Sequence, residues 1–458
     1  MANATASSSS NSTIQRGGCK DRQLNNDYDI RMWVGSIEEE RRGVCSWQSG
    51  STIFRVPNYL RKIKPEVYIP QSVSIGPLHY NEEHLQPMQV HKLRYLNRFL
   101  DRHKWKISLD DCVKAVSELE EKARKCYSET TGRGFEKDEF VKMMVIDSCF
   151  ILELFEIIKN EENDLFLNPS WFHPVLFDLI TLENQLPLFV LEHIYGLIYE
   201  LQTPMNNFSQ AIYDRLLRWF DLHDASHEQL TSVSLPEGGV KHLLDLLRSV
   251  LVNSSRRIRK AAKKWLVHTN CASELERAGV KFQKLEPSSS PESSLFDINF
   301  DINKGVLTIP TITIFDETEH TLRNLIALEK GQVLDITTDY FTAYAAFMDG
   351  LIDTRSDVEL LEKKGIIVNN IGNPEDVVTL FNNIVKHVTV QDPYFSGVIE
   401  DVIDYYNKPW NRRQASLMQN YFNTPWAFIS FLAALFLLIL TVGQTICSIL
   451  QVVWTQPP

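Results

Sequence analysis

The sequence has few cysteines, and their placement excludes two common uses of this residue. The seven cysteines are spread over 458 residues, their number is odd, and no CxxC pair occurs among them. Disulfide-stabilised secreted domains carry closely spaced, even sets of cysteines, and structural zinc sites carry CxxC pairs. The pattern therefore predicts reduced thiols in a cytosolic environment.

The chain also lacks an excess of positive charge. Its 47 Lys and Arg residues against 58 Asp and Glu residues give a formal net charge of −11 at pH 7. Nucleic-acid-binding proteins normally present a basic face, so we expect no nucleic-acid partner. The basic cluster of the chain contains Arg256, Arg257, Arg259 and Lys260. It is either a solvated helix face, which is the simpler interpretation, or a contact with acidic lipid headgroups.

Signatures of catalysis are missing as well. The sequence has no GxSxG nucleophile elbow, no HExxH zinc motif and no set of kinase motifs. Gly132-Arg133-Gly134 and Gly238-Gly239 lack the Lys-Ser/Thr step of a phosphate-binding loop. We therefore assign no catalytic residue and expect no cofactor.

Two histidines four residues apart are the candidate metal ligands. One face of a helix could present both His223 and His227 to a metal ion. A polar helix end or loop that happens to contain two histidines explains the pair more simply. We therefore predict no metal site.

Three acids in very apolar segments need an explanation. Asp147, Glu153 and Glu183 are predicted to be buried, and a buried carboxylate without a partner is costly. They could act as general acid and base, together with His79 or His173. The alternative, which we favour, is structural: each acid binds backbone amides or an arginine and fixes the arrangement of the helices.

A long apolar run near the C-terminus is the most informative feature that the sequence does contain. Residues 426–453 carry no charge. About 20 mostly apolar residues in a helix span a hydrocarbon core about 30 Å thick. We therefore predict a transmembrane helix over residues 426–447 that inserts this chain once into the lipid bilayer of the plasma membrane or an endomembrane. Representative residues of the predicted span are Trp426, Phe431, Leu435, Leu438, Leu440 and Val442.

The residues beside the predicted span suggest its orientation. Lys408, Arg412 and Arg413 precede the span, and the tail after it, residues 448–458, has no charge. Basic flanks tend to stay in the cytosol, so the main domain is predicted to be cytosolic, joined to the span by a juxtamembrane segment at residues 411–425. Gly443 and Cys447 are too few small residues to predict that the span dimerises.

The N-terminus has no apolar core and does not predict a signal peptide. Residues 1–30 are rich in Ser, Asn and Thr, and we predict them to be disordered. Insertion of the span would then follow synthesis, as in tail-anchored proteins. Glycosylation sequons would fit the opposite orientation, although short matches of this kind also arise by chance. The sequons begin at Asn3, Asn11, Asn207 and Asn253.

Hydrophobic periodicity predicts a mainly α fold. The segment 135–159 is apolar around most of its circumference and should be buried on nearly all sides. The segment 171–199 should end or kink at Pro187. The predicted helices cover residues 32–42, 88–105, 109–127, 135–159, 171–199, 208–222, 240–251, 271–279, 318–330, 335–352, 356–364, 374–388 and 395–407.

Two segments depart from the helical pattern. Residues 53–80 contain four prolines but many apolar residues, which predicts an ordered, irregular strap lying on the core. Residues 296–309 alternate apolar and polar side chains around Lys304-Gly305, which predicts a β-hairpin. The fold class is therefore mainly α: one large helical domain over residues 31–410 with a small β-hairpin, plus a single C-terminal transmembrane helix. A division into lobes near residue 290 stays open.

Several long motifs resemble a plant family known as domain of unknown function 247. They include MMVIDSCFILELF at residues 143–155, DLITLENQLPLFVLEHIY at residues 178–195 and FMDGLIDTRSDVELLEKKGII at residues 347–367. The resemblance implies a mostly helical plant protein with a C-terminal membrane anchor, and it supplies no catalytic residues. Ser148 stands where the usual motif of the family has Gly.

These observations predict a membrane-anchored, non-enzymatic protein. Its helical domain would bind an unknown protein partner in recognition or signalling. The first alternative is an enzyme that uses the buried acids. The second alternative is a scaffold that contacts lipid through the basic cluster.

Overall fold

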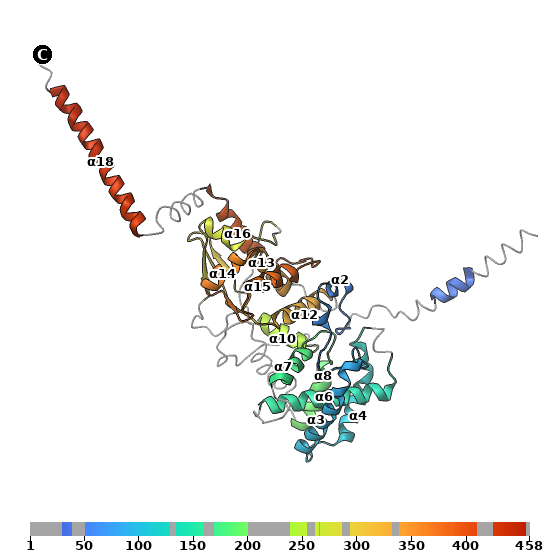
Figure 1. The fold of residues 1–458 in the computed structure, drawn as a ribbon. Helices are drawn as coiled ribbons and strands as arrows, with labels where there is room; N and C mark the ends of the chain where they lie inside the picture. The colour runs from blue at the N-terminus through green and yellow to red at the C-terminus, as the bar shows by residue number, and fades with distance from the viewer. Residues whose placement is uncertain are drawn as a thin grey trace, which may run out of the picture. The chain divides into compact units, whose positions relative to one another are not determined.

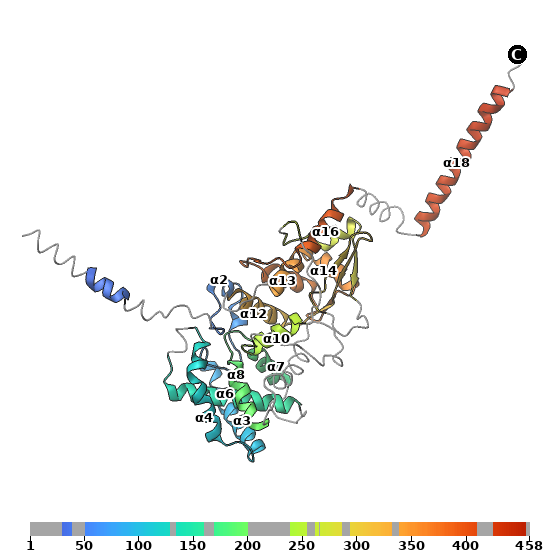
Figure 2. The same cartoon turned by 180° about the vertical axis from the view of Figure 1, so that it is seen from behind.

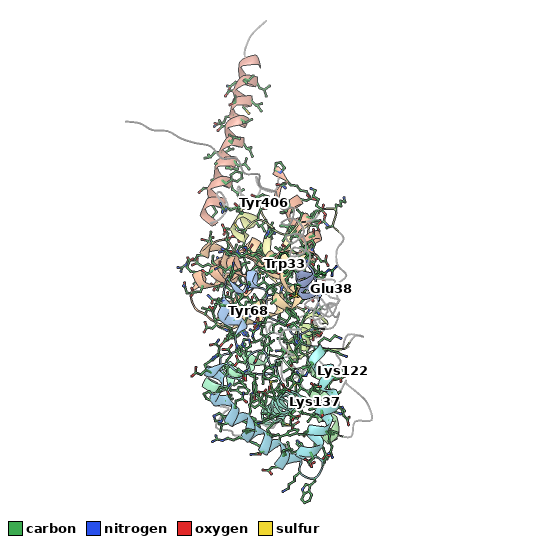
Figure 3. The ribbon with its side chains drawn as sticks, turned by 90° about the vertical axis from the view of Figure 1, so that its right-hand side faces the viewer. Trp33, Glu38, Tyr68, Lys122, Lys137 and Tyr406 are labelled. Carbon is green, nitrogen blue, oxygen red and sulfur yellow. The ribbon has the colours of Figure 1, made fainter. Side chains whose placement is uncertain are left out.

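The computed structural model describes residues 30–38, 51–128, 134–159, 169–199, 239–253, 262–264, 266–285, 294–331, 339–409 and 425–454. Residues 1–50 and residues 51–458 form two units. Residues 30–38 form a helix where the sequence predicts one at 32–42, and Figure 3 labels Trp33 and Glu38 on it.

Helix α6 is the centre of the first group of helices in residues 51–458. It packs against α3, α4 and α8, which lie beside it in both views (Figures 1 and 2). Phe140, Met144, Phe150 and Ile157 of α6 are all buried, because the helix carries apolar residues around most of its circumference. The predicted burial of this helix is confirmed. The helices of the group are α3 (Pro87–His103), α4 (Leu109–Lys125), α6 (Lys137–Lys159) and α8 (Leu188–Tyr199); α7 (Pro169–Leu179) lies between α6 and α8 in the sequence.

A second group of helices packs around α12, which contacts α10, α13 and α15. Helix α15 begins as its sequence predicts: the Asn373 side chain accepts a hydrogen bond from the Glu375 amide, and Pro374 is the first helical residue. The helices of the second group are α10 (Leu243–Asn253), α11 (Ala272–Arg277), α12 (Thr318–Lys330), α13 (Tyr340–Leu351), α14 (Arg355–Lys363), α15 (Pro374–Ile384) and α16 (Ser396–Tyr406).

The predicted hairpin is present, and it belongs to a slightly larger sheet. Strands β2 (Asn299–Asp301) and β3 (Val306–Ile309) are antiparallel, with Phe300 opposite Leu307. Strand β1 (Lys281–Lys284) adds to β3 in parallel. A separate parallel pair joins β4 (Ile312–Ile314) to β5 (Ile367–Asn369). The sequence did not predict these additional strands, because three or four residues are too few to show a period of two.

The irregular segment at residues 53–80, the strap, lies on the core as predicted. Its apolar residues Ile53, Val73 and Ile75 are almost completely buried. It contains the short helices α2 (Asn58–Arg61) and η1 (Pro65–Tyr68), and η2 (Glu83–Leu85) follows it. Tyr68, labelled in Figure 3, ends η1 and is also buried. The strap therefore contributes side chains to the core, although apart from its short helices it belongs to no helix or sheet.

The sequence prediction for residues 171–199 needs a correction. One helix ending or kinking at Pro187 was expected, but α7 ends at Leu179 and α8 begins at Leu188. The break therefore precedes Pro187, which is the residue directly before α8. The intervening residues hold the strap, and their side chains supply the hydrogen bonds that a continued helix would have made internally.

Candidate functional site

Asp178 and Asn184 bind the backbone of the strap. The Asp178 carboxylate accepts hydrogen bonds from the amides of Gln71, Ser72 and Val73 at 2.8, 2.6 and 2.8 Å. The Asn184 side chain accepts from the Ile75 amide at 2.7 Å and donates to the Val73 carbonyl at 2.9 Å. Burial raises the pKa of Asp178 to about 7, although the three amides act in the opposite direction. These contacts satisfy strap backbone groups that have no secondary-structure partner.

Gln185 closes the end of α7. Its Nε2 donates to the carbonyls of Leu179 and Thr181 at 2.7 and 2.8 Å, and its Oε1 accepts from the Leu244 amide at 3.2 Å. The carbonyls that Gln185 binds therefore belong to the end of α7 and the turn after it.

Glu183 is completely buried and collects four donors from the strap. Its Oε1 accepts from the Val56 amide at 2.6 Å and from Arg61, and its Oε2 lies 3.2 Å from His79 Nε2 and 3.5 Å from Arg55 Nη1. Burial acts to raise the pKa of Glu183, but the hydrogen bonds from His79, the Val56 amide and Arg61 outweigh it, so the pKa lies below its ordinary value. The acid is therefore held ionised between both ends of the strap.

Asp147 of α6 forms a buried ion pair with Lys92 of α3. Asp147 Oδ1 lies 2.5 Å from Lys92 Nζ, and its Oδ2 accepts from the Gly76 amide at 2.8 Å. Lys92 also donates to the Ser74 carbonyl. Burial raises the pKa of Asp147, and Lys92 and the Gly76 amide act against that rise. The pair joins two helices and the strap at one point.

Glu153 binds two arginines of α3 rather than the strap. Arg98 Nε lies 3.0 Å from its Oε1, and Arg102 donates from Nη2 to Oε1 at 2.7 Å and from Nε to Oε2 at 3.1 Å. Glu153 itself has no exposed surface. The contact therefore fixes α3 against α6 through a charged, multiply bonded pair.

The three predicted buried acids are thus all buried. Asp147, Glu153 and Glu183 have separate sets of partners, and both carboxylate oxygens of each acid are engaged. Of the two histidines considered with them, His79 binds Glu183, whereas His173 is exposed on α7. This arrangement is the one that a structural role predicts.

Gly76 is required where the strap passes the turn after α7. Its φ is +71°, and an added Cβ would lie 2.7 Å from the Gln185 carbonyl oxygen and 2.9 Å from Tyr127 Oη. We expect Gly76→Ala to lower the free energy of unfolding by at least about 1–2 kcal/mol from the positive φ alone. The urea midpoint of the full-length chain in detergent measures this. Gly196→Ala on α8, where an added Cβ meets no atom within 4 Å, is the matched control and should not destabilise. Equal losses in both variants would contradict the assignment.

Ser148 of α6 has a buried hydroxyl without a hydrogen-bond partner in the described part of the chain. Such a group costs about 1–3 kcal/mol, so we expect Ser148→Ala to raise the free energy of unfolding by about 1 kcal/mol. Ser148→Gly should gain less stability than Ser148→Ala, because Gly weakens a helix interior by about 1 kcal/mol relative to Ala. Urea titration compares the three chains. A lower midpoint for Ser148→Ala would show that the hydroxyl has a partner.

Helix α18 (Pro425–Trp454) is the second candidate functional element. The most apolar 18-residue stretch within its segment Ile429–Gln451 has a mean hydropathy of 2.2, and none of that stretch is buried. Large apolar side chains therefore face outward all along it, including the predicted span residues Phe431, Leu435, Leu438 and Val442. Leu440 is exposed as well, and Trp426 lies in the first turn. By length and composition, this helix can cross a membrane.

Several predicted groups lie outside the described residues. They are residues 1–29 of the segment 1–30 that was predicted to be disordered, the predicted helix at residues 208–222, His223 and His227, the basic residues Arg256, Arg257, Arg259 and Lys260, and the flanking Arg412 and Arg413. Lys408, the third flanking residue, is exposed. Within the described ranges, no group of three or more His, Cys, Asp or Glu side chains could hold a metal ion. The five cysteines that are described, Cys112, Cys126, Cys149, Cys271 and Cys447, are free thiols.

The fold and the site define a class of protein with two parts. The first is a mainly helical domain in which buried polar side chains bind the backbone of the strap. The second is an apolar helix long enough to span a bilayer. The chain belongs to the family DUF247, described as plant protein of unknown function, whose sequence profile matches residues 53–440. The family that the motifs predicted is therefore confirmed.

Two relatives from Arabidopsis thaliana share most of their length with this chain. UPF0481 protein At3g47200 is 32% identical over 428 residues, which cover 87% of this chain and 86% of that protein. Putative UPF0481 protein At3g02645 is 24% identical over 505 residues, which cover 90% of this chain and 94% of that protein. No solved structure matches the chain.

Proposed function

We propose that this protein is a membrane-anchored interaction protein: α18 crosses a lipid bilayer, and the helical domain binds another protein. The exposed apolar segment Ile429–Gln451 carries this proposal. In water, such a helix exposes apolar surface along its whole length, which is strongly unfavourable. A bilayer core removes this surface from water and matches the length of the helix.

The engagement of the buried acids supports a binding role over a catalytic one. General acid–base catalysis requires a carboxylic group that can reach a substrate proton. In Asp147, Glu153 and Glu183, both carboxylate oxygens instead accept hydrogen bonds from side chains or backbone amides of the same domain. Their role is to keep the domain in one conformation, and a preorganised surface lowers the entropy cost of binding a partner.

Exposed Lys408 and the basic residues that follow it support a cytosolic position for the domain. Protease added to sealed microsomes that contain the full-length chain with an N-terminal epitope tag tests this orientation. We expect the tag to be digested in intact vesicles. Protection of the tag until detergent is added would place the domain in the lumen and contradict the cytosolic assignment.

Proximity labelling in plant cells tests the interaction itself. A labelling enzyme is fused to the full-length chain and, as the matched control, to residues 410–458 alone, which keep the anchor and lack the domain. We expect the full-length chain to label a reproducible set of proteins that the anchor alone does not label. Identical sets from both fusions would contradict the proposed role of the domain.

A further inference from the structure

Two cysteine thiols lie together inside the first group of helices. Cys112 belongs to α4 and Cys149 to α6, and neither residue has exposed surface. The Cys149 thiol donates a hydrogen bond to the Cys112 sulfur. Two sulfur atoms in such contact need only a small movement to reach the bond length of a disulfide, about 2 Å.

The packing of α4 against α6 independently places the two thiols at the same depth. The end of α4 lies against the start of α6, where the Arg124 guanidinium carbon is 4.3 Å from the centroid of the Phe140 ring. A helix rises about 1.5 Å per residue, so Cys112 lies about 18 Å back along α4 from Arg124. Cys149 lies about 14 Å forward along α6 from Phe140. The two helices are therefore antiparallel, and their register brings the two cysteines within one helical turn of each other.

Cys112 is the thiol that reacts first. The hydrogen bond from Cys149 lowers the pKa of Cys112, whereas this bond and burial raise the pKa of Cys149 well above its ordinary value. The thiolate is the nucleophilic form of cysteine. Cys112 also lies near the start of α4, and the three residues before it, Leu109, Asp110 and Asp111, are exposed. The ends of helices open at little cost in free energy, which gives a small oxidant access to this thiol.

We propose that Cys112 and Cys149 form a reversible disulfide that cross-links α4 to α6 when the chain meets hydrogen peroxide. The Cys112 thiolate attacks one peroxide oxygen, so that an S–O bond forms, the O–O bond breaks, and the departing hydroxide takes up the proton that Cys112 released. The Cys149 sulfur then attacks the sulfenic acid: the S–S bond forms, the S–O bond breaks, and a second water leaves with the Cys149 proton. Two thiols are oxidised and one peroxide is reduced to two waters. A dithiol reverses the step by thiol–disulfide exchange.

The cross-link stabilises the first group of helices under oxidising conditions. It closes the chain between residues 112 and 149 into a loop, and a closed loop restricts the unfolded chain more than the folded one. Both cysteines belong to the helical domain, so the inference does not depend on the entry of α18 into a bilayer.

Peptide mapping tests whether the disulfide forms. The full-length chain in detergent is treated with hydrogen peroxide, its remaining thiols are blocked with N-ethylmaleimide, and it is digested with trypsin without reductant. We expect the peptides 107–114 and 143–159 to be joined, lighter than their sum by two hydrogen atoms, and separated by dithiothreitol. Cys126→Ala, which removes a half-buried thiol directly after α4, is the matched control and should keep this link. Absence of the joined peptides, or a link from Cys112 to any other cysteine, overturns the proposal.

Urea titration tests what the disulfide does. Each peroxide-treated chain is compared with the same sample after dithiothreitol, so that irreversible oxidation and the cost of each substitution are common to both. We expect oxidation to raise the urea midpoint of the wild-type chain and of Cys126→Ala, and to leave those of Cys112→Ala and Cys149→Ala unchanged. An equal rise in Cys112→Ala, or no rise in a wild-type chain that carries the link, overturns the stabilising cross-link.

Discussion

Lys92→Met is expected to lower the free energy of unfolding by about 3–5 kcal/mol, because it leaves the buried Asp147 carboxylate without its counter-charge. Neither side chain has more than 1% of its surface exposed, so water cannot replace the missing ammonium group. The Ser74 carbonyl loses its donor at the same time. Urea titration of the full-length chain in detergent, followed by far-UV circular dichroism, measures the change as a lower midpoint.

The double variant Lys92→Met/Asp147→Leu distinguishes the cost of an unpaired buried carboxylate from the contribution of the ion pair itself. Replacing both charges removes the uncompensated carboxylate, so we expect this variant to be more stable than Lys92→Met alone. Lys142→Met, at an exposed lysine on the same helix as Asp147, is the control and should change the midpoint little. If Lys92→Met behaves like Lys142→Met, the buried ion pair does not contribute as we infer.

Glu183→Ala is expected to lower the free energy of unfolding by a similar amount, about 3–5 kcal/mol at pH 7. The substitution leaves His79, Arg61 and the Val56 amide without the carboxylate that they share. The contacts of Glu183 reach both ends of the strap. Glu183→Ala should therefore destabilise the strap more than other substitutions in the turn between α7 and α8. The urea midpoint of the full-length chain again measures the loss.

The pH dependence of stability identifies the charge of Glu183. Its pKa in the folded chain lies below the ordinary value, so its stabilising contribution is present above about pH 4.3, the pKa of an unperturbed Glu. The contribution disappears as the pH falls through the folded-state pKa, because the unfolded chain binds the proton more readily. Glu183→Gln should therefore lose less stability than the wild-type chain between pH 5 and pH 3. Glu118→Gln, at an exposed site on α4, should follow the wild-type curve. Parallel curves for all three chains would contradict an ionised Glu183.

Local sequence patterns were sufficient for most of the described helices. The bounds of α12, Thr318–Lys330, coincide with the predicted segment, because an amphipathic period and flanking polar residues mark both of its ends. The β2–β3 hairpin was predictable because both strands and their turn are contiguous. By contrast, β1, β4 and β5 pair with strands that are not their neighbours in a hairpin, and no local period marks such short elements.

The partners of the buried acids could not be predicted, because they are distant in sequence. Val56 lies 127 residues and His79 lies 104 residues from Glu183. Sequence reasoning required that Glu183 have donors, but only the path of the strap decides which ones.

Extraction of membranes with alkaline carbonate tests most directly whether α18 anchors this protein in a bilayer. The full-length chain is compared with a chain that ends at residue 409 and therefore lacks the whole of α18. We expect the full-length chain to remain in the membrane pellet and the shortened chain to appear in the supernatant. A full-length chain released into the supernatant, or a shortened chain retained in the pellet, would contradict the account.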